Sequence, residues 1–119
     1  MKTIWNHLQG VDFQQRFYDA AGVRTRVIES GNSEKVLIFL HGTGGHAEAY
    51  LKNIATHSKH FRVMAIDMVG HGYTSAPDIS YDMQCYVDFL LDFLDEVGVE
   101  KPYISGESLG ATVAAWFAI

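Results

Sequence analysis

The sequence predicts an α/β fold in which a mostly parallel sheet has helices on both faces. Three apolar runs that end at glycine-containing loops begin near residues 36, 61 and 103. A stretch with helical spacing of apolar residues follows each run. Strands that alternate with helices in this way are parallel and are joined by right-handed crossovers.

The segment that precedes these runs predicts an antiparallel pair of strands. Apolar residues recur on either side of Ala21–Gly22 in the stretch VDFQQRFYDAAGVRTRVIES, residues 11–30. Alternation interrupted by a small residue and glycine is typical of a hairpin, so we place the turn at Ala21–Gly22. The polar stretch 31–35 then forms a loop.

The three apolar runs predict the central strands. VLIFLHG (36–42) and FRVMAIDMVGHG (61–72) read as strands that are covered on both faces and end in glycine loops. KPYISGES (101–108) contains the third, shorter strand. Helices are expected at 46–60, between the first two strands, and from residue 109 onward.

The clearest predicted helix covers residues 81–98, YDMQCYVDFLLDFLDEVG. Acidic residues mark one side, and we expect the opposite, apolar side to face the core. Gly98 ends the helix, because a left-handed residue commonly stops one. The residues predicted to be buried are Tyr86, Val87, Leu90, Leu91, Leu94 and Val97.

The composition excludes several classes of protein. A formal net charge of −5 without clustered Lys or Arg argues against a nucleic-acid partner. The N-terminal residues show no signal-peptide pattern, and no run is long and apolar enough to span a membrane. The single cysteine, Cys85, cannot form an internal disulfide, which suits a reducing compartment. We therefore expect a soluble cytoplasmic protein with no membrane partner.

Ser108 is the candidate nucleophile. It lies in Gly106-Glu107-Ser108-Leu109-Gly110, between a predicted strand and a predicted helix. Such a serine must turn the chain sharply, and the two glycines give room for the turn. The turn exposes the hydroxyl and directs the first amides of the helix towards it. The alternative is a serine that only caps a helix.

The loop His41-Gly42-Thr43-Gly44-Gly45 predicts an oxyanion hole. Two backbone N–H groups stabilise the oxyanion of acyl transfer, here the amide of Leu109 and that of Thr43 or Gly44. We take Thr43 as the second donor and expect Gly42 and Gly44, together with Glu107, on the substrate side. The loop lacks the Lys-Ser/Thr of a phosphate-binding P-loop. We interpret His41 as a buried structural histidine.

Two other motifs favour structural explanations. Gly70-His71-Gly72 lacks the third glycine of a dinucleotide fingerprint, so a tight loop explains it better than a nucleotide binder does. His57 and His60 have the spacing of two metal ligands, but no further ligands accompany them, and we expect no metal. No cofactor is predicted.

The motifs HGTGG, D-x-x-G-H-G-x-x-S and G-E-S-L-G, in this order, resemble the first part of α/β-hydrolase-fold serine hydrolases. The sequence is most similar to carbon–carbon bond hydrolases of aromatic meta-cleavage pathways, such as 2-hydroxymuconic semialdehyde hydrolase. It departs from them at Glu107, Leu109 and Ala111, where that group has Asn, Met and Gly. The resemblance implies attack on a carbonyl and hydrolysis of a C–C bond in a 2-hydroxy-6-oxo-dienoate. The alternative is a carboxylesterase or lactonase that acts on a small ester.

In this fold an Asp or Glu and then a His follow the nucleophile in the chain. Only eleven residues follow Ser108, and none is acidic or histidine. We therefore expect residues 1–119 to be the N-terminal part of a single α/β-hydrolase domain without an internal boundary. The rest of the hydrolase, in the same chain or a second one, would supply both residues, and an oligomer is possible. Residues 1–119 alone would be nearly inactive. A hydrolase-like module without catalytic activity is the other alternative to an enzyme.

Overall fold

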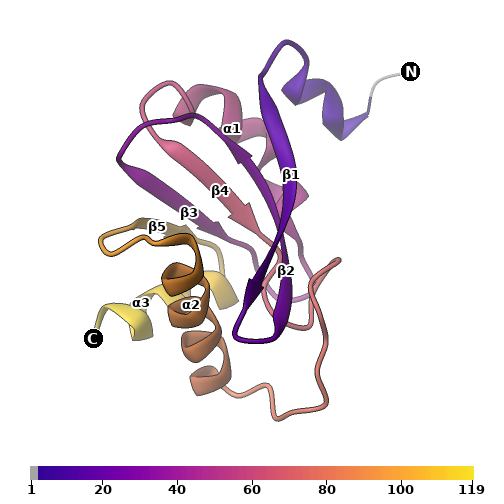
Figure 1. Ribbon diagram of the computed structural model, residues 1–119. Coiled ribbons are helices and arrows are strands. Elements are labelled where there is room, and N and C mark those ends of the chain that lie inside the picture. Colours follow the sequence, from indigo (N-terminus) through magenta and orange to yellow (C-terminus); the bar gives the residue numbers. More distant parts are fainter. Residues whose placement is uncertain (1–2) are drawn as a thin grey trace.

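The computed structural model describes residues 3–119, which form a five-stranded sheet in the order β1-β2-β4-β3-β5 with helices on both faces (Figure 1). Helices and strands alternate after an N-terminal hairpin, as the sequence predicts. The elements are η1 (Ile4–Leu8), β1 (Phe13–Ala20), β2 (Val23–Ser30), β3 (Val36–Leu40), η2 (Ala47–Tyr50), α1 (Leu51–His57), β4 (Arg62–Ile66), α2 (Met83–Val97), β5 (Tyr103–Gly106) and α3 (Leu109–Ala118).

The β1–β2 hairpin turns at Ala21–Gly22, which confirms the prediction. Ala20 pairs with Val23, and the two residues between them have φ values of 50° and 87°. Positive φ at both central residues defines the turn whose twist matches that of the flanking strands. The Asp19 carboxylate supports the turn by accepting a 2.8 Å hydrogen bond from the Gly22 N–H.

The sheet is mixed, and its parallel part consists of the three strands predicted from apolar runs. β3 is parallel to both β4 and β5, whereas β2 is antiparallel to β1 and β4. In this register Leu40 lies opposite Ile66 on one side and Gly106 on the other. The loops that follow β3, β4 and β5 therefore leave the sheet at the same edge.

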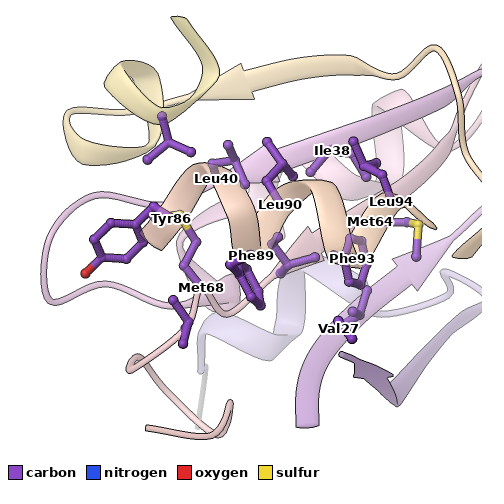
Figure 2. Packing of buried hydrophobic residues seen from close by; sticks show 14 of the residues in the cluster. Val27, Ile38, Leu40, Met64, Met68, Tyr86, Phe89, Leu90, Phe93 and Leu94 are labelled. Carbon is purple, nitrogen blue, oxygen red and sulfur yellow. The ribbon is translucent and has the colours of Figure 1, made fainter. Parts of the chain in front are cut away.

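Each face of the sheet has its own apolar core. α2 and α3 cover one face, and α1 with η1 covers the other (Figure 1). Figure 2 shows Phe89, Leu90 and Phe93 of α2 packed with Ile38 and Met64 of the sheet. All five residues of β3 are buried, as expected for a strand covered on both sides.

Helix α2 ends at Gly98 as predicted, but it begins at Met83 rather than at residue 81 and buries only part of the predicted face. Asp82 caps its start by accepting a hydrogen bond from the Cys85 N–H, and Gly98 ends it with a φ of 74°. The prediction that Leu91 is buried is wrong, because its side chain is 45% exposed whereas Leu90 is 0% exposed, and Val97 is only half-buried. Each residue turns the helix by about 100°, which carries Leu91 past the stripe that packs on the sheet. Phe89 occupies that stripe instead.

The helix predicted over 46–60 is shorter and divided. The 3₁₀ turn η2 comes first, and α1 then ends at His57. No helix among residues 3–119 is long and apolar enough to cross a membrane.

Candidate functional site

Ser108 lies at the edge of the sheet where the parallel strands end. It follows β5 by two residues and directly precedes α3, and it is exposed. The neighbouring strand β3 ends at Leu40, whose carbonyl accepts a 3.1 Å hydrogen bond from the Glu107 N–H. This bond fixes the start of the turn against the end of the adjacent strand.

The backbone at Ser108 has the sharp conformation predicted for a nucleophile between strand and helix. Its φ is 53° and its ψ is −112°, a conformation that costs a residue with a side chain about 1–3 kcal/mol. A Cβ on Gly106 would lie 2.4 Å from the Gly110 carbonyl carbon. A Cβ on Gly110 would lie 2.1 Å from the Leu40 carbonyl oxygen. Both glycines are therefore required for β5, the turn and α3 to pack this closely.

The glycine-rich loop after β3 meets the turn at Ser108. The Gly45 N–H donates a 3.0 Å hydrogen bond to the Gly42 carbonyl, and Gly44 has a φ of 73°. Positive φ at the third residue only is the signature of a type II turn. A Cβ added to Gly42 would be 3.5 Å from the Ser108 Cβ, so the loop backbone lies against the serine.

The other predicted site residues surround this contact. Thr43 and Gly44 are the exposed central residues of the turn, and Glu107 is exposed beside Ser108. Leu109 is the first residue of α3, and its amide is one of the first-turn N–H groups that a helix leaves free. The structure brings these residues to one edge, while their roles in an oxyanion hole and towards a substrate stay predictions.

His41 is a structural residue in this site, as predicted from the sequence. Its ring is fully buried, Nδ1–H donates to the Gly42 carbonyl at 2.8 Å, and Nε2 accepts from the Met68 N–H at 2.9 Å. These partners require the neutral ring with its proton on Nδ1. Burial lowers the pKa of His41, which keeps the ring neutral. His41 thereby ties the glycine-rich loop to the loop after β4.

A buried ion cluster beside the loop was missed by the sequence analysis. Arg26 of β2 forms two hydrogen bonds with Glu48 of η2, at 2.6 and 2.9 Å, and lies 3.4 Å from the Asp67 carboxylate. The hydrogen bond from Arg26 lowers the pKa of Glu48. The available signal was a charged residue inside TRVIES, a stretch otherwise suited to a buried strand.

Within the part of the chain that the structure describes, no general base is hydrogen-bonded to Ser108. Among residues 3–119, no hydrogen bond joins a histidine to the Ser108 hydroxyl. His41 has both nitrogens engaged, and Nδ1 of His71 faces the Val69 carbonyl at 3.1 Å. Within the same residues no group of three or more His, Cys, Asp or Glu is arranged to hold a metal ion, and His57 instead pairs with the Asn53 carbonyl.

Comparisons with known proteins identify the family to which the chain belongs. The family described as alpha/beta hydrolase fold matches residues 35–119, which include the glycine-rich loop and Ser108. A 2-hydroxy-6-oxo-6-(2'-aminophenyl)hexa-2,4-dienoic acid hydrolase of Metapseudomonas resinovorans is 36% identical over 102 residues, 82% of this chain and 35% of that protein. A dihydrolipoyllysine-residue acetyltransferase component of the acetoin cleaving system of Cupriavidus necator is 32% identical over 104 residues, 87% of this chain and 28% of that protein.

A solved structure of a hydrolase has the same fold over most of this chain. The crystal structure of a serine hydrolase involved in carbazole degradation superposes with a TM-score of 0.82 at 32% identity, over 91% of this chain and 43% of that one. The chain thus spans about a third of the length of the curated relatives it matches.

Proposed function

Because this chain belongs to the alpha/beta hydrolase fold family, we propose that it contributes the nucleophile and the oxyanion hole of a serine hydrolase. The observation on which this proposal rests is the conformation of Ser108 next to the glycine-rich loop. Ser108 has a φ of 53°, is exposed and directly precedes α3, and a Cβ added to Gly42 of the loop would lie 3.5 Å from its own Cβ.

In the proposed reaction the Ser108 Oγ attacks a carbonyl carbon of the substrate. The carbonyl oxygen becomes an oxyanion, which accepts hydrogen bonds from the amides of Leu109 and Thr43. Each such donor contributes about 3 kcal/mol of transition-state stabilisation in related sites. Gly42, Gly44 and Glu107 border the space in which the substrate would lie.

Serine with its ordinary pKa is a poor nucleophile, so a base must take its proton. We propose that an Asp or Glu and a His from the remainder of the hydrolase, in this chain or a partner chain, complete the site. This assignment follows the order nucleophile, acid, histidine of the family. It is also consistent with the engagement of both His41 nitrogens in the loop.

The proposed substrate is a 2-hydroxy-6-oxo-dienoate. The relative from Metapseudomonas resinovorans acts on a compound of this type, according to its name. Attack on the distal ketone, after ketonisation of the dienol, breaks the adjacent C–C bond and leaves the acyl group on Ser108. Water then releases the acyl group as a carboxylic acid, and the other product is a 2-hydroxydienoate.

The test is labelling of the complete protein by a fluorophosphonate, read by intact mass. A single adduct on Ser108, absent in Ser108→Ala, is the expected result. Loss of dienoate absorbance with release of the acid would then support the C–C hydrolase. Turnover of p-nitrophenyl esters without dienoate cleavage would favour the esterase alternative, and an unlabelled Ser108 would contradict both.

A further inference from the structure

Arg26 is a buried charged side chain on β2. Only 2% of the Arg26 side chain is exposed, so its positive charge is almost entirely removed from water. Nε donates to the Gln15 side chain at 2.9 Å, and the two terminal nitrogens donate to Glu48. The Asp67 carboxylate lies within 3.5 Å of one of them. A buried charge persists only when it is paired and hydrogen-bonded to this extent.

The partners of Arg26 hold the far end of the glycine-rich loop. Glu48 belongs to η2, which begins directly after residues 42–46. Asp67 accepts a 2.7 Å hydrogen bond from the Ala47 N–H with one oxygen and a 2.9 Å bond from the Tyr73 N–H with the other. Residues 47 and 48 are therefore fixed both to β2 and to the loop after β4.

The near end of the loop is held in the same place by His41, whose Nε2 accepts from the Met68 N–H. η2 is also tied back to the end of β3, because the Tyr50 hydroxyl donates to the Leu40 carbonyl at 2.6 Å. That carbonyl also accepts from the Glu107 N–H, one residue before Ser108. The position of η2 is thus connected to the position of the nucleophile by two hydrogen bonds on one oxygen.

We propose that Arg26, through Glu48 and Asp67, is a positioning residue that sets the oxyanion loop against Ser108. This inference rests on the proposed function. Arg26 does not touch the reacting atoms, and Ser108 and residues 42–44 lie beyond its contacts. Its effect is to fix η2, and a fixed η2 holds the turn at 42–45 in place.

Charge explains why the loop depends on Arg26. The cluster contains one guanidinium and two carboxylates, and the exposed His46 ring lies 2.9 Å from Glu48 on its outer side. Removing Arg26 therefore leaves Asp67 and Glu48 as neighbouring carboxylates without the cation between them. Asp67 is fully buried and bonded to two backbone amides, whereas Glu48 is partly exposed. Glu48 is therefore the group that would move towards water and draw η2 with it. Displacement of a catalytic group by about 1 Å can slow a reaction by about 100-fold.

The experiment compares Glu48→Gln and Arg26→Met with wild type in the complete protein. Glu48→Gln keeps the shape of the side chain and removes the charge pair. The matched control is Arg62→Met, which removes an arginine that pairs with Glu29 at 3.2 Å and begins β4 at the opposite edge of the sheet. Two measurements are made: the saturation rate kinact and KI of Ser108 labelling by a fluorophosphonate, and hydrogen exchange of the peptide that contains residues 42–48.

Both cluster variants should lower kinact by about 10- to 100-fold with KI unchanged, since the loss concerns the transition state alone. Exchange at 42–48 should be faster in both, while Arg62→Met behaves as wild type. Unchanged kinact and exchange would overturn the inference. If Arg26→Met does not fold, Glu48→Gln decides. If wild type is not labelled, the proposed function fails, and exchange at 42–48 alone then supports or refutes the positioning role.

Discussion

Replacing Ser108 with glycine should give a more stable protein than replacing it with alanine. Both variants remove the hydroxyl, so they differ only in the Cβ that stands on a residue with a φ of 53°. Alanine keeps the strain of this backbone conformation, whereas glycine adopts positive φ without steric cost. The comparison isolates the energy stored in the turn from any effect of the lost oxygen.

The expected difference follows from two opposing terms. Relief of a sparsely populated conformation gains about 1–3 kcal/mol. The greater freedom of glycine in the unfolded chain costs about 0.5–1 kcal/mol. We therefore expect Ser108→Gly to exceed Ser108→Ala by about 1 kcal/mol in free energy of unfolding, with Ser108 labelling lost in both.

Urea unfolding of the complete protein at constant pH measures this difference, provided that both variants have the same m-value. Ser105 supplies the control, because it lies in β5 with ordinary extended backbone. There glycine should be less stable than alanine by about 0.5–1 kcal/mol, so the sign reverses three residues away. If glycine at position 108 were no more stable than alanine, the strain assigned to the turn would be refuted.

Three further predictions concern the supports of the site and the core. Burial lowers the pKa of His41, so at acidic pH the unfolded chain binds a proton that the folded chain excludes. The free energy of unfolding should therefore fall below about pH 6.5, by up to about 1.4 kcal/mol per pH unit. In urea unfolding His41→Asn should reduce this slope, whereas His60→Gln, at an exposed position, should leave it unchanged. Gly110→Ala places a Cβ 2.1 Å from the Leu40 carbonyl oxygen and should lower the free energy of unfolding by more than about 2 kcal/mol. The same change at a helical glycine with open space around it should instead raise that free energy by about 0.4–1 kcal/mol. Leu90→Ala should cost about 3 kcal/mol and Leu91→Ala less than about 0.5 kcal/mol, and equal losses would contradict the observed rotation of α2.

The fold could be predicted from sequence where one local pattern determines one element. The run VLIFL has no polar residue at all, which leaves a strand buried on both faces as the natural interpretation. Gly22 and Gly98 mark a turn and a helix end because glycine adopts positive φ without steric cost. The burial of Leu91 was predicted wrongly because the local pattern there allows more than one buried face. A helix with apolar residues at 86–87, 89–91 and 93–94 has an apolar arc wider than the contact with a sheet, and only packing decides which flank stays in water.

The same distinction applies to the candidate site. Ser108 and Gly42 could be singled out from the sequence because each lies in a glycine-rich stretch that directly follows an apolar strand. The structure shows that the two stretches are in contact. The ion cluster of Arg26, Glu48 and Asp67 was not predicted. Arg26 lies 41 positions before Asp67 and 22 before Glu48, and nothing near it in sequence predicts two carboxylates across the sheet.

Arg26 shows why a residue that looks unfavourable on a buried strand can be retained. The antiparallel pairing of β2 with β4 places the Arg26 carbonyl 3.0 Å from the Asp67 N–H, at the edge where the parallel strands end. Three loops leave the sheet at this edge, and each brings backbone amides that need fixed acceptors. An apolar residue at position 26 would fill the space but could not hold two carboxylates that in turn hold residues 47 and 73. Burial raises the cost of the charge, yet hydrogen bonds to Glu48 and the charge of Asp67 outweigh it, so the pKa of Arg26 is raised. In the positioning role that we propose, the cluster fixes the loop that faces Ser108, and this role requires a charged residue on a buried strand.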